Sequence, residues 1–228
     1  MVTELNRLNI TAAQESMLKE YLSQLCQANG RVRLTGSSDP TVLWQEHVTD
    51  CLYLASAVEG TEKIIDVGTG GGLPGVVLAV CFPKSHVTLL DSQKKKAVQL
   101  GKIVEALELE NVSVISARSE ELAAARREEW DCAVARAVCE APVLAEYLSP
   151  LVRQGGCLLA MKGPAWEEEV LPVQGKWSAL GLSEPRALSY QLGESARVIL
   201  RWDKVAAIDK KYPRRPGRAE KIGWWKNA

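Results

Sequence analysis

Short runs of β-branched and aliphatic residues alternate with helical stretches through the middle of the chain, and this alternation limits the possible folds more than any other feature. Alternating strands and helices form right-handed crossovers, which place the strands parallel in a sheet with helices on both faces. The expected strands are 63–67, 86–90, 112–116, 131–135 and 157–161, and the expected helices lie near 74–82, 93–108, 119–128, 140–152 and 165–181. We therefore predict an α/β fold.

A hairpin is expected near the end of the chain. The runs 186–192 and 197–203 flank Gly193-Glu194-Ser195, which has the composition of a turn. With this hairpin the predicted sheet has seven strands, mostly parallel, with an antiparallel terminal strand.

The residues before the first strand are expected to be helical. A first set of apolar residues recurs at helical spacing, namely Leu18, Tyr21, Leu22 and Leu25. Asn29-Gly30 suits a left-handed helix end, and Asp39-Pro40 supplies an N-cap and a first-turn proline for the next helix. The expected organisation is one compact domain, with an N-terminal helical cap over 1–59, a core over 60–205 and a basic C-terminal tail over 206–228.

The composition is that of a soluble globular protein, with 46% hydrophobic and 25% charged residues in a chain of 228. No apolar stretch approaches the ~20 residues that span a bilayer. The first residues lack the order of a signal peptide, so we expect a cytoplasmic protein without a membrane partner. The six cysteines form no Cys-x-x-Cys pair and there are two histidines. We therefore expect buried, reduced thiols and no metal site.

The net charge is zero, but the charges are unevenly distributed. Residues 197–228 contain ten basic and three acidic side chains, which gives this end of the chain a charge of +7. Such asymmetry indicates an anionic partner, with a solvated terminus as the alternative. The cations that we assign to this contact are Lys210, Lys211, Arg214, Arg215 and Arg218.

A glycine-rich turn joins the first strand of the expected core to its helix. Read as Gly70-x-Gly72-x-x-Gly75, the turn matches the fingerprint of dinucleotide-binding folds. Read as Asp66-x-Gly68-x-Gly70-x-Gly72, it places a carboxylate at the strand end, which suits S-adenosylmethionine. Asp66 would attract the ammonium group of that ligand but would repel a pyrophosphate. A turn without a ligand would not need so many glycines.

The next strand also ends in an acidic residue. Asp91 lies 19 residues after Gly72, where a carboxylate accepts both ribose hydroxyls of a nucleoside cofactor. Because NAD and S-adenosylmethionine both contain this ribose, Asp91 indicates a nucleoside site without separating the two. The run Lys94-Lys95-Lys96 follows, either as a solvated face or as a contact with a nucleic-acid backbone.

Several short motifs accompany the glycine loop. They are Asp66–Gly75, Leu89-Leu90-Asp91-Ser92, Arg118-Ser119-Glu120-Glu121, Ala135-Arg136-Ala137, Met161-Lys162-Gly163, His47-x-x-Asp50-x-Leu52 and Tyr212-Pro213-Arg214-Arg215-x-Gly217. In this combination the chain resembles the bacterial glucose-inhibited division protein B family (GidB, or RsmG), the small-subunit ribosomal RNA guanine-N7 methyltransferases. The resemblance extends from about Asn29 to Lys221.

The resemblance implies a Rossmann-like S-adenosylmethionine-dependent methyltransferase fold. In such a site Gly68 and Leu73 would line the cofactor pocket, and Asp91 would hold the ribose. Ser119-Glu120 would flank the adenine, and Arg136 would lie near the transferred methyl. The complete expected cofactor-binding set is Asp66, Gly68, Gly70, Gly72, Leu73, Asp91, Ser119, Glu120 and Arg136.

Two of these residues also have structural interpretations. Arg136 ends the fourth expected strand, at the edge of a parallel sheet where ligands bind, but a salt bridge at the edge of the core is an alternative. Glu120 could equally be a first-turn carboxylate that stabilises its helix dipole.

The chain departs from the family pattern at three places. The family often has Asn-Leu-Thr after its first helix, whereas here four residues separate Asn29 from Leu34-Thr35. Cys51 replaces a serine in the histidine motif, which puts a polar role of that position in doubt. Gly71 is an extra glycine in a slot that we expect to be variable.

The resemblance also implies the reaction, which is methylation of N7 of a guanine in 16S ribosomal RNA. Guanine N7 has a lone pair and no proton, so in-line attack on the sulfonium methyl requires orientation but no general base. We assign no catalytic base. The substrate is free RNA or a 30S subunit, and we expect the protein to be a monomer.

Three further residues are expected at the RNA. His47 and Asp50 would shape the RNA entrance, with a structural hydrogen-bonded pair as the alternative, and Lys162 would contact phosphate or guanine. Two other functions stay open: a dinucleotide-dependent oxidoreductase, and a non-catalytic RNA-binding ribosome-assembly factor.

Overall fold

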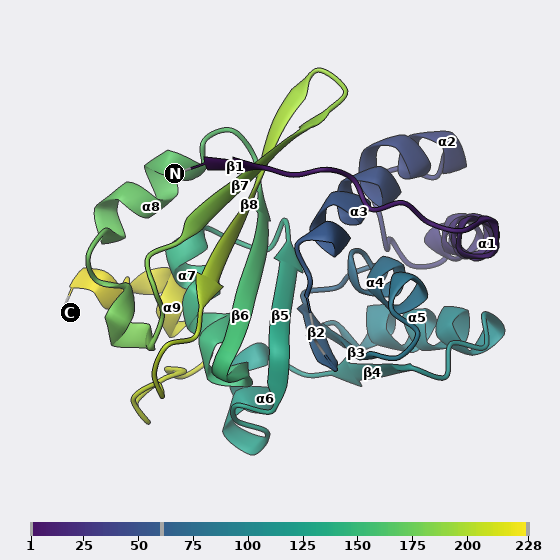
Figure 1. Ribbon diagram of the computed structural model, residues 1–228. Helices are drawn as coiled ribbons and strands as arrows, with labels where there is room; N and C mark the ends of the chain where they lie inside the picture. The colour runs from purple at the N-terminus through teal and green to yellow at the C-terminus, as the bar shows by residue number, and fades with distance from the viewer. Residues whose placement is uncertain (1, 60–61, 227–228) are drawn as a thin grey trace. The chain divides into compact units, whose positions relative to one another are not determined.

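The computed structural model describes residues 2–59 and 62–226, which form two compact units (Figure 1). The N-terminal unit contains residues 5–117, and the C-terminal unit contains residues up to Glu4 and from Arg118 onward. The boundary that we expected after Glu59 adjoins Gly60 and Thr61, which lie outside the described residues, as do the last two residues of the tail.

The N-terminal unit begins with helices, as the apolar spacing predicts. Helix α1 (Ala12–Asn29) starts in a capping box, in which the Thr11 hydroxyl accepts from the Gln14 amide and the Gln14 side chain accepts from the Thr11 amide. The helix buries its predicted apolar face. Its end differs from the prediction, because Gly30 has a right-handed φ of −68°.

The next helix starts where Asp39-Pro40 predicts, but it is irregular. The Asp39 carboxylate accepts from the Thr41 amide at 2.8 Å and caps α2 (Pro40–Val42). A π-helical segment, η1 (Leu43–Val48), follows and leads into α3 (Thr49–Ser56). The apolar spacing predicted a helix here without indicating the wider turn.

Three parallel strands complete the N-terminal unit. They are β2 (Lys63–Val67), β3 (His86–Asp91) and β4 (Val112–Ser116), connected by α4 (Gly75–Cys81) and α5 (Lys94–Ala106). Val67 is in register with Leu90, so β2 and β3 end side by side at the same edge.

Five strands form the sheet of the C-terminal unit, in the order β1-β7-β8-β6-β5. Their bounds are β1 (Val2–Glu4), β5 (Trp130–Arg136), β6 (Val152–Lys162), β7 (Arg186–Leu192) and β8 (Ser195–Asp203). Strands β5 and β6 are parallel, and β8 is antiparallel to both β6 and β7, which confirms the terminal hairpin. All seven predicted strands are present, and β1, which pairs in parallel with β7, is an additional one.

The helices of this unit are short. They are α6 (Ser119–Ala125), α7 (Ala141–Leu148), α8 (Trp166–Val170) and α9 (Arg218–Lys221), with 3₁₀ turns η2 (Ser149–Leu151), η3 (Leu171–Val173), η4 (Trp177–Leu180) and η5 (Trp224–Lys226). The single helix expected over 165–181 is wrong. Pro172 has no amide to donate, and Gly175 has a left-handed φ of 78°, so the helical pattern breaks into turns.

Three buried tryptophans pack together in the C-terminal unit. The ring centroids of Trp177 and Trp202 lie 5.3 Å apart, and Trp224 approaches Trp177 at 5.7 Å. The indole of Trp224 donates to the Pro142 carbonyl at 2.8 Å, so this residue packs against the protein. The tail is therefore docked, although most of it is neither helix nor strand (Figure 1).

The burial expected for the cysteines is present at three of the six. All six cysteines are free thiols; Cys51, Cys132 and Cys157 are buried and the others are half-buried. Among residues 2–59 and 62–226, no helix is both long and apolar enough to cross a membrane.

Candidate functional site

The glycine loop after β2 has the backbone conformation that its sequence suggests. Gly68, Gly70 and Gly72 have φ values of 76°, 57° and 106°, a region that L-residues with side chains rarely adopt. The amides of Gly68 and Thr69 both donate to the Leu90 carbonyl, at 2.9 and 3.0 Å. The loop is thus held against the end of β3.

Asp66 shapes this loop from inside the protein. Its side chain is fully buried, and its Oδ2 accepts from the Thr69 hydroxyl at 2.7 Å and from the Gly75 amide at 2.8 Å. The carboxylate therefore connects the strand end to the start of α4. The expected contact with a ligand ammonium group stays a prediction.

Asp91 joins the loop to the neighbouring strand. Its Oδ2 accepts from the Gly70 amide at 2.9 Å and its Oδ1 accepts from the Gln93 amide at 2.8 Å. Each oxygen accepts one bond here, and a carboxylate oxygen has a second lone pair. The carboxylate is thus fixed in orientation and has the capacity to accept two ribose hydroxyls, so these residues fit a nucleoside cofactor.

Helix α1 supports the loop through contacts that the sequence analysis missed. The Tyr21 hydroxyl donates to the Gly71 carbonyl at 2.9 Å. A Cβ on Gly71 would lie 2.9 Å from Leu25 Cδ1 and 3.1 Å from the Leu34 carbonyl oxygen, so this slot does not accept a side chain freely. A polar residue on the otherwise apolar buried face of α1 was the available signal. Leu73, also expected at the site, is buried.

The four residues that separate Asn29 from Leu34-Thr35, in departure from the family pattern, do not keep these residues apart in the structure. The Asn29 side-chain oxygen accepts from the amides of Leu34 and Thr35, at 2.7 and 3.0 Å. The four intervening residues therefore form a loop whose ends meet. The arrangement brings Asn29 together with the Leu-Thr pair that follows it directly in the family pattern.

In the C-terminal unit, Ser119 and Glu120 begin α6 and are both buried. The Ser119 hydroxyl donates to Glu120 Oε2 at 3.1 Å, and Glu120 Oε1 accepts from the Gly217 amide at 3.4 Å. The contact with Gly217 connects this pair to the tail, and nothing local in the sequence predicted it.

Arg136 is half-buried at the end of β5, as expected. The next residue, Ala137, has a left-handed φ of 54°, which is unfavourable for a residue with a Cβ. The chain therefore turns sharply after Arg136. Strained backbone of this kind is concentrated at functional sites.

The residues expected at RNA fall into different environments. His47 is half-buried in η1, and Asp50 is buried in α3. Lys162 ends β6, and its ammonium donates to the Cys139 carbonyl at 2.7 Å and to Glu169 Oε2 at 2.6 Å. With a side chain 9% exposed, Lys162 is occupied by contacts within the protein.

The tail cations also divide into two groups. Arg214 forms a two-pronged ion pair with Glu146, a fully buried carboxylate in α7, and so has a structural role. The other four are exposed: Lys210, Lys211, Arg215 and Arg218. Lys211 also lies 3.7 Å from Asp209 Oδ2.

Two half-buried cysteines are protonated at neutral pH. Burial raises the pKa of the Cys81 thiol to about 11 and that of the Cys139 thiol to about 12. Since the thiolate is the nucleophilic form, neither residue is an activated nucleophile.

Comparisons with known proteins identify the family of the chain. A family model described as rRNA small subunit methyltransferase G (GidB) matches residues 14–196. The protein named ribosomal RNA small subunit methyltransferase G from Leuconostoc citreum is 35% identical, with 96% of each chain covered. The protein of the same name from Pelotomaculum thermopropionicum is 38% identical, with 93% of this chain and 91% of that one covered.

Solved structures show the same fold at low identity. Cofactor-bound Rv0187 from MTB has a TM-score of 0.58 at 16% identity, with 84% of this chain and 91% of that one covered. The O-methyltransferase from Bacillus cereus in complex with SAH has a TM-score of 0.56 at 18% identity, with 85% and 98% covered. The fold is thus that of methyltransferases, and the expected resemblance is confirmed: the chain belongs to the rRNA small subunit methyltransferase G family.

Proposed function

We propose that this protein transfers a methyl group from S-adenosylmethionine to N7 of a guanine in 16S ribosomal RNA. The observation that carries the proposal is the pairing of the glycine loop with the oriented Asp91 carboxylate, in a chain that the family model matches over residues 14–196. The assignment of N7 as the methylated atom and of 16S ribosomal RNA as the substrate rests on family membership.

The N-terminal unit supplies the glycine loop, Asp66 and Asp91 for the cofactor. The left-handed glycines let the ligand approach the main chain closely, and Asp91 accepts the two ribose hydroxyls. Asp66 holds the loop in shape while its negative charge favours the ammonium group. When bound, S-adenosylmethionine supplies an electrophilic methyl group on a sulfonium. Ser119, Glu120 and Arg136 belong to the proposed set by resemblance.

No proton-transfer residue is needed. Guanine N7 attacks with a lone pair and carries no proton, so the protein must hold the base in line with the methyl group. Orientation of this kind lowers barriers by up to about 7–11 kcal/mol in favourable systems.

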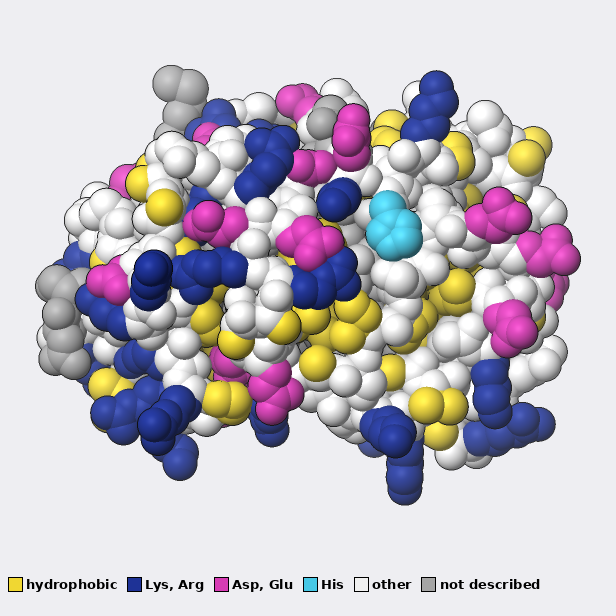
Figure 2. Space-filling model, turned by 90° about the horizontal axis from the view of Figure 1, so that it is seen from below, with side chains coloured by type: hydrophobic (Ala, Val, Ile, Leu, Met, Phe, Trp, Pro, Cys, Tyr) yellow, Lys and Arg dark blue, Asp and Glu magenta, His cyan; other side chains and the backbone are white. Residues whose placement is uncertain are grey.

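The exposed tail cations are proposed to bind RNA phosphates. The net charge is zero, and the face shown in Figure 2 carries Asp and Glu as well as Lys and Arg side chains, so a general coating by RNA is not favoured. The local excess of Lys210, Lys211, Arg215 and Arg218 provides a positive segment. We assign His47 and Asp50 to the RNA entrance, and we expect a monomer acting on free RNA or on a 30S subunit.

The test is methyl transfer to RNA from a strain that lacks this enzyme. Purified protein is incubated with labelled S-adenosylmethionine and either deproteinised 16S RNA or 30S subunits, and the modified base is mapped. Label at N7 of one guanine is expected, and the preferred form identifies the substrate. If no methyl group is transferred to the free RNA or to the 30S subunit while RNA binding is intact, the protein is a non-catalytic assembly factor.

Binding measurements separate the cofactor classes. Wild-type protein should bind S-adenosylhomocysteine, and Asp91→Ala should weaken that affinity at least about tenfold, because a charged hydrogen-bond acceptor is lost. Glu105→Gln, an exposed change in α5, is the matched control and should have no effect. Binding of NADH without affinity for S-adenosylhomocysteine would favour an oxidoreductase.

A further inference from the structure

Residues 208–217, called here the tail segment, contain neither helix nor strand. Their position therefore depends on contacts with other parts of the C-terminal unit. The segment includes three of the exposed cations proposed to bind RNA, namely Lys210, Lys211 and Arg215.

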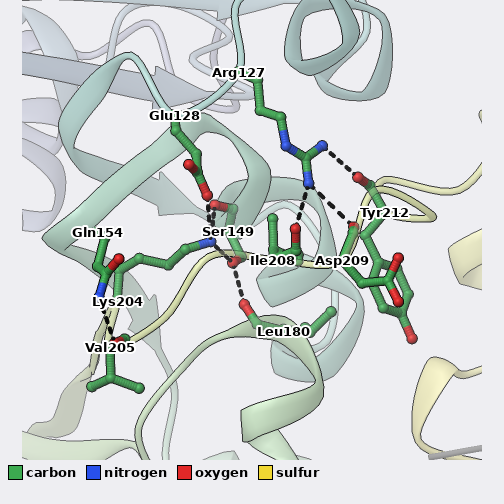
Figure 3. A network of polar contacts seen from close by, with 10 residues as sticks. All are labelled: Arg127, Glu128, Ser149, Gln154, Leu180, Lys204, Val205, Ile208, Asp209 and Tyr212. Carbon is green, nitrogen blue, oxygen red and sulfur yellow. Dashed lines mark hydrogen bonds and ion pairs between the residues drawn. The ribbon is translucent and has the colours of Figure 1, made fainter.

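Arg127 provides the first of these contacts. Its Nη1 donates to the Tyr212 carbonyl at 2.6 Å, and its Nη2 donates to the carbonyls of Ile208 and Asp209 at 2.9 and 3.2 Å (Figure 3). One guanidinium thus holds three backbone carbonyls of the tail segment, on both sides of Lys210-Lys211. Because its donors face the main chain, Arg127 is placed to position the segment rather than to bind phosphate.

Two further contacts continue along the segment toward α6. The buried Glu146 carboxylate accepts from the amide and from the guanidinium of Arg214. The Gly217 amide then donates to Glu120 Oε1 at 3.4 Å. The anchored segment therefore ends on the carboxylate that family resemblance places beside the adenine.

We propose that Arg127 is a positioning residue that couples cofactor binding to RNA binding. It holds the tail segment so that the Gly217 amide orients Glu120 while the neighbouring cations face RNA. The inference rests on the proposed function. It adds Arg127, a residue that touches neither ligand. It also adds the ten residues of the tail segment, 208–217, as the part of the chain that both ligands favour in its ordered state.

The physical reason is the cost of ordering. Without Arg127, the segment gains conformational freedom that either ligand must remove when it binds. Both affinities should therefore fall together. In the protein without Arg127, the first ligand to bind should order the segment for the second. The affinity for each ligand should therefore be higher when the other ligand is bound.

The experiment compares Arg127→Gln with Arg126→Gln. Arg126 lies in the same loop, but its guanidinium pairs with Glu129 and lies over the Trp130 ring. Affinities for S-adenosylhomocysteine and for 16S RNA are measured by calorimetry and by filter binding. Arg127→Gln should weaken both by about fivefold or more and speed amide exchange in residues 208–217, and Arg126→Gln should change neither affinity more than about twofold.

A coupling measurement separates positioning from a general structural effect. In Arg127→Gln, saturating RNA should improve the affinity for S-adenosylhomocysteine at least about threefold, and in the wild type it should improve it less. Arg127→Lys keeps the charge and part of the contact, so an intermediate effect is expected if Arg127→Gln does not fold. Arg215→Gln should weaken RNA binding alone.

The outcomes distinguish this inference from the proposed function. If the wild type binds S-adenosylhomocysteine and folded Arg127→Gln binds both ligands as tightly as the wild type, the coupling role of Arg127 is wrong and the proposed function stands. If the wild type does not bind S-adenosylhomocysteine, both are wrong.

Discussion

Gly75 shows how one residue can have a packing role that its motif obscures. In the sequence it completes a dinucleotide fingerprint, but a Cβ there would lie 2.1 Å from Leu89 Cδ2 and 2.9 Å from Asp66 Oδ2. Its small size therefore lets α4 pack closely against β3 beside the carboxylate that shapes the loop. The sequence identified the position without separating ligand contact from close packing.

We expect Gly75→Ala to destabilise the protein by about 1–3 kcal/mol, because the added methyl must displace Leu89 or Asp66. It should also weaken binding of S-adenosylhomocysteine. Gly101→Ala in α5 is the control: a Cβ there meets nothing within 4 Å, and alanine should raise stability by at most about 1 kcal/mol. Urea denaturation measures both, and equal effects would contradict the packing role.

Lys204 is a second residue whose behaviour follows from burial. Its ammonium donates to the carbonyl and hydroxyl of Ser149, at 2.9 and 2.8 Å (Figure 3). Burial lowers the pKa of Lys204 from 10.5 to about 8, although the Glu128 carboxylate, 3.7 Å away, acts in the opposite direction. The folded state therefore loses this proton more readily than the unfolded chain.

The pH dependence has a definite sign. Between about pH 8 and 10.5 the unfolded chain holds more protons at Lys204, so this group makes the free energy of unfolding rise with pH. The rise should be at most about 3 kcal/mol. We expect the difference in the free energy of unfolding between the wild type and Lys204→Met to increase by up to this amount between pH 7.5 and 10.5. Urea denaturation of the two proteins measures this difference. Parallel curves for the two proteins would contradict the lowered pKa.

At the scale of elements, periodicity predicted most of the fold. The strands and the first helices were predictable because alternation and helical spacing are local signals. The π-helical segment η1 was not, since apolar spacing tolerates a locally wider turn. The broken region after β6 was misassigned although Pro172 and Gly175 were visible, because its apolar spacing outweighed these breakers.

The docking of the tail onto α7 can be tested through its ion pair. Arg214→Ala should leave the fully buried Glu146 carboxylate without its partner and cost about 3–5 kcal/mol in the free energy of unfolding. Arg215→Ala is the matched control, and its exposed side chain should contribute within about 0.5 kcal/mol. Adding Glu146→Gln to Arg214→Ala should recover part of the loss. Equal stability of the two single variants would contradict a structural role for Arg214.

At the scale of the whole molecule, the site was only partly predictable. Parallel topology places strand ends at one edge, so Asp66, the glycines and Asp91 could be assigned from order along the chain. The contact of Gly217 with Glu120 joins residues 97 apart in sequence, and a local sequence pattern cannot predict a contact between residues so far apart in the chain. Strand β1 is only three residues long and likewise gave no signal.

Strand β1 covers the outer edge of β7, and its removal has a local consequence. Deleting residues 1–4 should expose the β7 backbone and speed amide exchange around 187–189 about tenfold, equal to about 1.4 kcal/mol of opening free energy. It should also favour association through the open edge. Exchange in β3 of the N-terminal unit is the internal control and should not change. Unchanged exchange around 187–189 would contradict the pairing.

The same strand determines how folding can follow synthesis. Val2–Glu4 is synthesised before residues 5–117, but its partners, Ala187–Ser189, are synthesised after them. Residues 5–117 are complete much earlier and contain three paired strands with their helices, so this unit can fold while translation continues. Strand β1 therefore stays without its partner until Ala187–Ser189 have been synthesised.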